Sequence, residues 1–194
     1  MTIGARMEKL LGLIGKQCRA IDRKSIERFI DSIENAKRIF ITGAGRSGLV
    51  GRAFGMRLMH LGFPVYIVGE TVTPSVKKGD LLVAISGSGE TTSTAVLIDT
   101  AKKRGLLVVA MTSIPDSTIG KAADVRLIIK GRVADEGGRD YSARQLEGMH
   151  EPLTPLGTLF ELSTMIFLDS IIDELMIRHG KGEDYLKTRH ANLI

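Results

Sequence analysis

The sequence predicts an α/β fold in which a doubly wound, five-stranded parallel sheet lies between layers of helices. Strand and helix patterns alternate from residue 38 to residue 129. The predicted strands are continuous apolar runs, which are typical of strands buried on both faces of a parallel sheet. Two glycine-rich turns follow strands, and right-handed crossovers bring both to the carboxyl edge of the sheet, where such folds bind ligands.

Size and charge limit the possible functions. The chain has 194 residues, enough for one domain with a sizeable core, and we expect residues 1–194 to form that single domain. Its hydrophobic fraction of 43% and charged fraction of 25% are those of a soluble globular protein. The net charge of +5 is spread along the chain, so it suits an anionic small molecule and does not require nucleic acid as a partner.

Cysteine usage and hydropathy exclude further classes. The single cysteine, Cys18, cannot form an internal disulfide, and no Cys/His cluster has metal-ligand spacing. No signal peptide pattern begins the sequence, and no apolar run approaches the length that spans a bilayer. These features predict a cytoplasmic protein that has no metal site and no membrane contact.

Residues 2–36 have helical periodicity and predict two amphipathic helices before the first strand. These helices can pack on the sheet or on a neighbouring subunit, and the sequence leaves both arrangements open. The first apolar stripe consists of Met7, Leu10, Leu11, Ile14, Cys18 and Ile21, and the second of Ile26, Phe29, Ile30 and Ile33.

The first half of the sheet begins with a predicted strand at 38–42 and the glycine-rich turn 43–48. A helix follows and ends at Gly62, since glycine is favoured just beyond a helix C-terminus. Pro64 opens the second strand, 65–68, and a proline-containing loop leads onward.

The second half of the sheet starts with the third strand, 81–85, and a helix from about 91 to 104 that ends at a glycine. A fourth strand at 106–111, a short helix at 116–123 and a fifth strand at 125–129 complete the pattern. This order gives the five parallel strands of the predicted sheet.

The remainder of the chain begins with a long polar segment, 131–153, of the length that is usual for a binding segment or a partly disordered loop. Thr154 and Pro155 are an N-cap and first-turn pair that opens a strong helix to about 178. A last short helix is predicted at 183–189, and the helices between 155 and 190 are expected to pack on the sheet or on a neighbouring subunit.

The turn after the third strand predicts a phosphate site. Ser86, Ser88 and Thr91 offer hydroxyl groups, and Gly87 and Gly89 let the backbone approach an anion closely. The first N–H groups of the following helix would point at that anion. The alternative is an ordinary strand-to-helix turn with a serine cap. There is no Gly-Lys-Ser/Thr ending, so the turn is not a nucleotide P-loop.

The turn 43–48, Gly-Ala-Gly-Arg-Ser-Gly, matches the dinucleotide fingerprint, and Glu70 follows the next strand, where a ribose-binding acid would lie. NAD binding is therefore an alternative. Arg46 and Ser47 within the turn suit a sugar phosphate better, and the second hydroxyl-rich turn has no role in dinucleotide binding.

Glu161 is a carboxylate on an apolar stripe, in line with Met165, Leu168 and Ile172 on the long helix that begins at 155. Two interpretations are open. One is a side chain at the rim of the core that pairs with an arginine, and the other is a partly desolvated general base.

The other ionisable candidates carry weaker signals. Glu147 and Glu151 are expected to be solvated loop charges, whereas His190 precedes an apolar tail, Leu193 and Ile194, that is expected to dock. The remaining histidines have no companions at metal-ligand spacing and are interpreted as structural: His60, His150 and His179.

These motifs together resemble the sugar isomerase (SIS) domain, whose paired loops are similar to GAGRSG and SGSGET here. Within that domain family the resemblance is closer to the 6-phospho-3-hexuloisomerases, and it covers about residues 30 to 194. The motifs that carry it are Arg57-Leu-Met-His-Leu-Gly-Phe63, Val68-Gly-Glu70, Pro155-Leu-Gly-Thr-Leu-Phe-Glu161 and His190-Ala-Asn-Leu193.

The resemblance implies a sheet with the strand order of flavodoxin-like proteins, and a homotetramer with no metal or organic cofactor. It also implies interconversion of D-arabino-hex-3-ulose 6-phosphate and D-fructose 6-phosphate, a step of formaldehyde metabolism through the ribulose monophosphate route. Glu161 would be the proton acceptor, and His190 the second acid/base, from the same chain or a neighbouring subunit. The implied sugar-phosphate contacts are Ser47, Ser86, Gly87, Ser88, Gly89, Glu90, Thr91 and Thr92.

Two rival functions stay open. One is another isomerase of the same domain, such as one that acts on arabinose 5-phosphate. The other is a sugar-phosphate-sensing regulator, which would carry a DNA-binding domain of about seventy residues ahead of the sheet, whereas about 36 residues precede the first strand here.

Overall fold

The computed structural model describes residues 1–131 and 157–193. Predictions about Glu147, His150, Glu151, the Thr154–Pro155 helix start and Ile194 fall outside these ranges. Within them, no helix is both long and apolar enough to cross a membrane.

The sheet has five parallel strands in the order β2-β1-β3-β4-β5, so the predicted fold class and strand order are confirmed. Each strand lies within one or two residues of its predicted position. The strands are β1 (Ile39–Gly43), β2 (Val65–Ile67), β3 (Leu81–Ile85), β4 (Leu107–Thr112) and β5 (Val125–Ile128).

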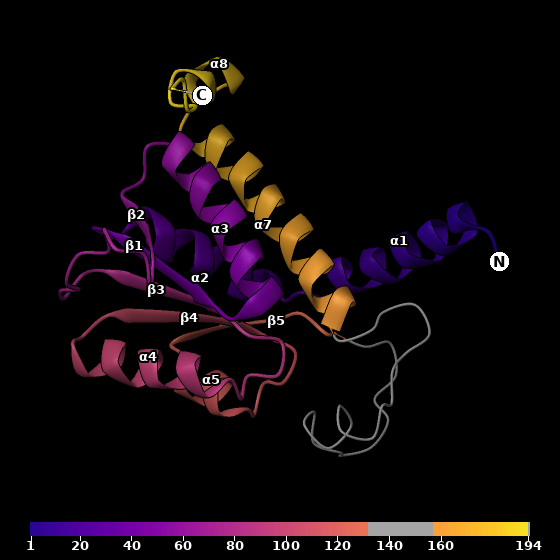
Figure 1. Ribbon diagram of the computed structural model, residues 1–194, viewed down its shortest axis with the longest axis horizontal. Coiled ribbons are helices and arrows are strands. Elements are labelled where there is room, and N and C mark those ends of the chain that lie inside the picture. The colour runs from indigo at the N-terminus through magenta and orange to yellow at the C-terminus, as the bar shows by residue number, and fades with distance from the viewer. Residues whose placement is uncertain (132–156, 194) are drawn as a thin grey trace.

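Helices cover both faces of this sheet (Figure 1). The first core cluster packs α2, α3 and α7 on one face, and the second packs α4 and α5 on the other. The helices are α1 (Ile3–Arg19), α2 (Arg23–Glu34), α3 (Gly45–His60), α4 (Thr92–Lys103), α5 (Thr118–Ala122), α7 (Thr158–Arg178) and α8 (Glu183–Lys187).

The central strand β3 shows why the apolar runs are continuous. All five of its residues are buried. Leu81, Val83 and Ile85 join the first core cluster, whereas Leu82 and Ala84 join the second. Because successive side chains point to opposite faces and both faces are covered, each position requires an apolar residue.

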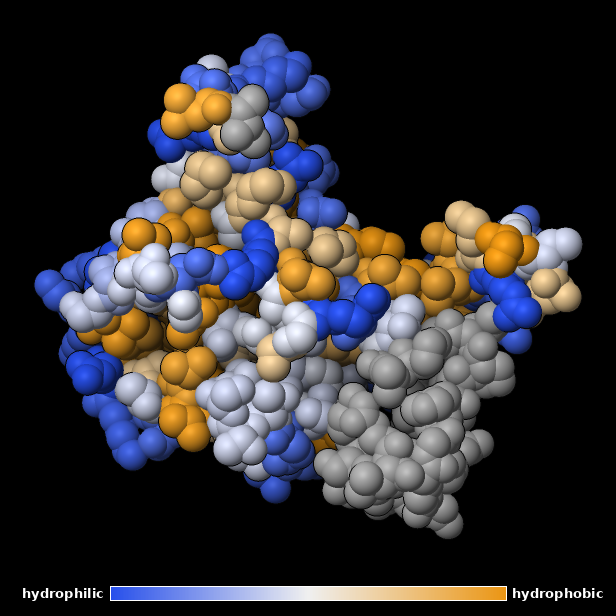
Figure 2. Space-filling model, in the orientation of Figure 1, coloured by the Kyte–Doolittle hydropathy of each residue, from blue (hydrophilic) through white to orange (hydrophobic). Residues whose placement is uncertain are grey.

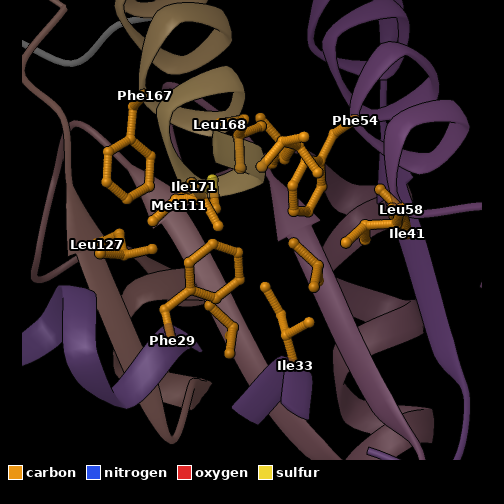
Figure 3. Packing of buried hydrophobic residues seen from close by; sticks show 14 of the residues in the cluster. Phe29, Ile33, Ile41, Phe54, Leu58, Met111, Leu127, Phe167, Leu168 and Ile171 are labelled. Atoms are coloured by element: carbon orange, nitrogen blue, oxygen red, sulfur yellow. The ribbon is translucent and has the colours of Figure 1, made fainter. Parts of the chain in front are cut away.

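Aromatic rings fill the centre of the first core cluster (Figure 3). Phe29 on α2 lies 6.1 Å from Phe54 on α3 and 6.2 Å from Phe167 on α7, measured between ring centroids. The same three helices therefore contact one another as well as the sheet. Burying three such side chains contributes several kcal/mol to stability, at about 2–3 kcal/mol each.

Two glycines let α3 approach the sheet closely. A Cβ atom on Gly51 would lie 2.9 Å from Ile41, and one on Gly55 would lie 2.9 Å from Ile67. Any larger residue at these positions would press against β1 or β2. The pair of glycines thus sets the distance between helix and sheet.

The N-terminal helix α1 contacts α7 and extends away from the sheet, whereas α2 packs on the sheet (Figure 1). The predicted apolar stripe of α1 is only partly covered within one chain. Ile14 is buried, but Met7 and Leu11 are 60% and 61% exposed. Figure 2 shows this apolar surface along α1.

Candidate active site

Two loops meet at the carboxyl edge of the sheet because β1 and β3 are adjacent and in register. Gly43, at the end of β1, pairs with Ile85, at the end of β3. The first loop is shorter than predicted, since α3 already begins at Gly45 and Ser47 lies half-buried in its first turn. The second loop, residues 86–91, joins β3 to α4 and is called the β3–α4 loop below.

Both helices that follow these loops present their N-termini at this edge. The N-cap residues are Ala44 for α3 and Thr91 for α4, and among the described residues neither makes a side-chain capping bond. The helices have 16 and 12 residues, so each contributes a dipole and unpaired N–H groups. Two such ends at one edge suit an anionic ligand.

Hydroxyl groups shape the β3–α4 loop from within. The buried Ser86 Oγ lies 3.0 Å from the Thr91 Oγ1 and accepts a hydrogen bond of 3.2 Å from the Gly89 N–H. The Ser88 Oγ accepts from the Glu90 N–H at 3.2 Å. Ser88 and Thr91 are half-buried, and both hydroxyl groups can still turn toward a ligand at the loop surface.

Gly89 occupies a position that only glycine fits. Its φ is +66°, and a Cβ atom there would lie 2.0 Å from the Ser117 Oγ. The Gly89 carbonyl also accepts a hydrogen bond of 3.0 Å from the Ile119 N–H. The β3–α4 loop therefore lies directly on the start of α5.

Glu90 points toward α5 as well. Its two carboxylate oxygens accept from the Thr118 hydroxyl at 2.6 Å and the Thr118 N–H at 2.8 Å. These bonds, from the hydroxyl first and then the amide, lower the pKa of Glu90 below its usual value. Thr92, the first residue of α4, is exposed at the same edge.

Glu161 lies in the first turn of α7 and is 8% exposed. Arg46, in the first turn of α3, donates a hydrogen bond from its Nε to the Glu161 carboxylate. The sequence left open whether an arginine would pair with this glutamate. The structure shows that Arg46, in the first turn of α3, is that arginine. The carboxylate thus faces the carboxyl edge of the sheet.

The residue before Glu161 contacts the other loop. A Cβ atom on Gly87 would lie 3.0 Å from the Phe160 ring, so the ring packs directly on the β3–α4 loop. Consecutive residues of α7 therefore contact the two loops, Phe160 on one and Glu161 on the other. The first turn of α7 therefore lies against both the start of α3 and the β3–α4 loop.

The structure does not bring His190 to this place within one chain. The His190 ring lies 5.3 Å from the ring of His60, the last residue of α3. Arg46 is near the opposite end of that helix, which has 16 residues and is therefore roughly 24 Å long at 1.5 Å per residue. Figure 1 shows the C-terminus and the start of α7 at opposite ends of the α3–α7 pair.

Two features bear on the dinucleotide alternative. Glu70, the proposed ribose ligand, pairs with Arg52 of α3. A hollow between β1, β2 and α3 has a volume of about 40 Å³, whereas pockets for organic ligands usually measure about 300 Å³ or more.

Among residues 1–131 and 157–193, no three His, Cys, Asp or Glu residues gather in a way that could hold a metal ion.

Comparison with known proteins identifies the family of this domain. The model of the SIS domain matches residues 32–146, well over half of the chain. The chain belongs to the SIS domain family.

Relatives with this SIS domain are similar over nearly the whole chain. An uncharacterized protein of Aeropyrum pernix is 47% identical, with 96% of this chain and 90% of the relative covered. A 3-hexulose-6-phosphate isomerase of Bacillus subtilis is 37% identical, with 95% of each covered. The crystal structure of a Methanococcus jannaschii protein, for which the molecular function of 3-hexulose-6-phosphate isomerase is inferred, has 36% identity and a TM-score of 0.79, covering 95% of this chain and 98% of that one.

Sequence reasoning missed the contact between His60 and His190, which no local pattern signals. His60 is 2% exposed, and burial lowers the pKa of its imidazole, with further lowering by the neighbouring His190 and Arg57. A histidine whose pKa is lowered by folding destabilises the folded chain in acid, since the unfolded state takes up the proton first, below about pH 6.5.

We therefore expect the free energy of unfolding to fall between pH 7 and pH 5.5, and His60→Phe to reduce that fall while keeping an aromatic ring beside His190. Chemical denaturation at a series of pH values measures this effect. His179→Phe is the matched control, since His179 lies against Phe63 and Glu34 elsewhere, and it should leave the contribution of His60 intact. Parallel pH profiles for the wild type and His60→Phe would contradict the prediction.

Proposed function

We propose that this SIS domain protein is a sugar-phosphate isomerase that interconverts D-arabino-hex-3-ulose 6-phosphate and D-fructose 6-phosphate. The observation that carries the proposal is the position of the Glu161 carboxylate, beside the β1–α3 turn and one residue from the contact of Phe160 with the β3–α4 loop. The relatives named as 3-hexulose-6-phosphate isomerases, similar over nearly their full length, support the choice of substrate.

In this proposal the β3–α4 loop and the start of α4 bind the phosphate group. Ser88 and Thr91 would donate hydroxyl hydrogen bonds, and the uncapped N-terminus of α4 would add N–H groups and a favourable dipole. Ser47, in the first turn of α3, would contact the sugar from the other side. Binding at the phosphate end fixes the reacting carbons against Glu161, which lowers the entropic part of the barrier.

Glu161 would act as the base. Its carboxylate takes the proton from carbon 2 of the 3-keto sugar, the electron pair of that C–H bond forms the double bond to carbon 3, and the carbonyl electrons move to oxygen 3. A proton then reaches oxygen 3, oxygen 2 loses its proton, and the carboxyl group returns its proton to carbon 3. Because the reaction is internally balanced, it needs no external oxidant or reductant.

The proton that moves between the two oxygens needs a second group. His190 is the candidate from the sequence, because an imidazole can both accept and donate a proton. Within one chain it lies at the far end of α3 from Glu161. The proposal therefore requires His190 of a neighbouring copy to complete the site.

Exposed apolar side chains support self-association, and we propose a homotetramer. On α1 the exposed residues are Ile3, Met7 and Leu11. The helices α3 and α7, which contact each other, add Leu49, Met56, Met59, Ile166 and Ile177. Large apolar side chains that are exposed on neighbouring helices in this way often mark an interface.

Replacing the proposed base tests the mechanism directly. Glu161→Gln should lower kcat by roughly 10³-fold or to background, because the amide cannot accept the proton, while fructose 6-phosphate binding survives. An isomerase assay coupled to fructose 6-phosphate detection measures turnover, and calorimetry measures binding. Glu174→Gln is the matched control, since Glu174 is an exposed partner of Arg178 on the same helix. Near-normal turnover of Glu161→Gln would refute the assignment.

Replacing loop hydroxyl groups tests the phosphate site. Ser88→Ala or Thr91→Ala should raise KM by about tenfold and lower kcat less, because the lost hydrogen bonds hold the substrate in both the ground state and the transition state. Steady-state kinetics over several ketose phosphates give both constants and also test arabinose 5-phosphate. Loss of kcat at unchanged KM would instead place these hydroxyl groups in the chemical step.

Charge on α1 tests self-association. The wild type should show a mass near four times the 21.1 kDa of one chain by light scattering, and Met7→Asp with Leu11→Asp should lower it. The two aspartates would be buried without a partner in the proposed interface, which is costly. Lys9→Asp, at an exposed position of the same helix, is the control and should leave the mass unchanged. A monomeric wild type at micromolar concentration would overturn this part of the proposal.

A further inference from the structure

The β3–α4 loop contains one charged residue, Glu90, and its charge has the wrong sign for a phosphate ligand. A carboxylate among the hydroxyl groups of the loop would repel a phosphate group at close range. The sequence places Glu90 beside Ser88 and Thr91, yet the structure directs its carboxylate to the opposite side, onto Thr118 of α5.

Three hydrogen bonds join two consecutive loop residues to two consecutive residues of α5. Glu90 accepts from the Thr118 N–H at 2.8 Å and from the Thr118 hydroxyl at 2.6 Å. The Gly89 carbonyl accepts from the Ile119 N–H at 3.0 Å. Two of these bonds end on a carboxylate, and charge-assisted bonds are roughly twice as strong as neutral ones.

The loop is also joined to the segment after β4. The Gly87 carbonyl accepts a hydrogen bond of 3.0 Å from the Ser113 N–H. The loop is therefore bonded both to the segment that follows β4 and to α5. Its other side contacts Phe160 and faces the start of α7. Without Glu90, the turn between Gly89 and α4 would keep a single backbone bond to α5.

We propose that Glu90 is a positioning residue, which holds the β3–α4 loop against α5 in the shape that binds the phosphate group and does not itself contact the substrate. This inference rests on one part of the proposed function, namely that the β3–α4 loop binds the phosphate group, and it does not require the isomerase reaction. The lowered pKa of Glu90 agrees with it, since the carboxylate stays ionised and the contact intact at neutral pH.

Two roles for Glu90 make opposite predictions about its neutralisation. If the carboxylate acted on the phosphate through charge, Glu90→Gln would remove repulsion and lower KM. If it positions the loop, Glu90→Gln removes the negative charge that strengthens both hydrogen bonds from Thr118, loosens the loop and raises KM. The sign of the change therefore separates the roles.

The experiment combines kinetics with a double-mutant cycle. Glu90→Gln and Thr118→Val should each raise KM by about tenfold with kcat within about threefold, and the double variant should be little worse than either, since both remove one interaction. Thr118→Ser keeps the hydroxyl group and should restore KM. Asp99→Asn is the matched control: it neutralises an exposed carboxylate on α4 that pairs with Lys103, and it should change nothing.

A second measurement does not depend on turnover. Hydrogen exchange of the Ile119 amide should become faster in Glu90→Gln and stay unchanged in Asp99→Asn, since that amide bonds to Gly89. Calorimetry with glucitol 6-phosphate should show about tenfold weaker binding for Glu90→Gln. If the wild type isomerises no ketose phosphate, the proposed function fails, and these two measurements still test Glu90.

Several outcomes would overturn the role of Glu90. A lower KM in Glu90→Gln would make it a charge effect on the phosphate group. Additive effects of Glu90→Gln and Thr118→Val would show that the two side chains act separately. A loss of kcat at unchanged KM would place Glu90 in the chemical step.

Discussion

The pairing of β1 with β3 is the constraint on which the rest of the site depends. Parallel register sets Gly43 opposite Ile85, so the chain leaves both strands at the same height. Both connections then turn into helices whose N-termini lie at this same edge, α3 on one face of the sheet and α4 on the other. Ligand sites of doubly wound sheets form at such edges because successive helix N-termini converge there.

The start of α7 completes the edge from a distant part of the chain. Arg46 and Glu161 are 115 residues apart in sequence, yet their pair joins α3 to α7. A carboxylate that is almost fully buried needs a partner, because leaving it unpaired would cost several kcal/mol. The mostly exposed Arg46 supplies that partner while the apolar residues that follow Glu161 pack in the core. Packing of α7 in the core and the ion pair with Arg46 therefore both fix the position of the carboxylate.

The sequence predicted the sheet well because its signal is local. Apolar runs bounded by glycine and proline mark each strand, whereas the strand order came from the resemblance to the SIS domain. The β3–α4 loop was visible for the same reason. Contacts between distant segments gave no such signal. The partner of Glu161 stayed undecided and the contact of His60 with His190 was missed. The hydrogen bonds of Glu90 to Thr118 could not be predicted either, because they depend on the position of α5.

The glycines of α3 give the site a sensitivity that its own residues do not reveal. Gly51 and Gly55 lie one and a half to two and a half turns along the helix from Arg46, with no side chain between the helix backbone and the sheet. A helix moves nearly as a rigid rod, so a methyl group added at Gly51 would lift or tilt it about the point of contact. The displacement would appear at the end that carries Arg46. Evolution of this protein can therefore retune the geometry around Glu161 from the helix–sheet spacing, without replacing any residue that meets the ligand.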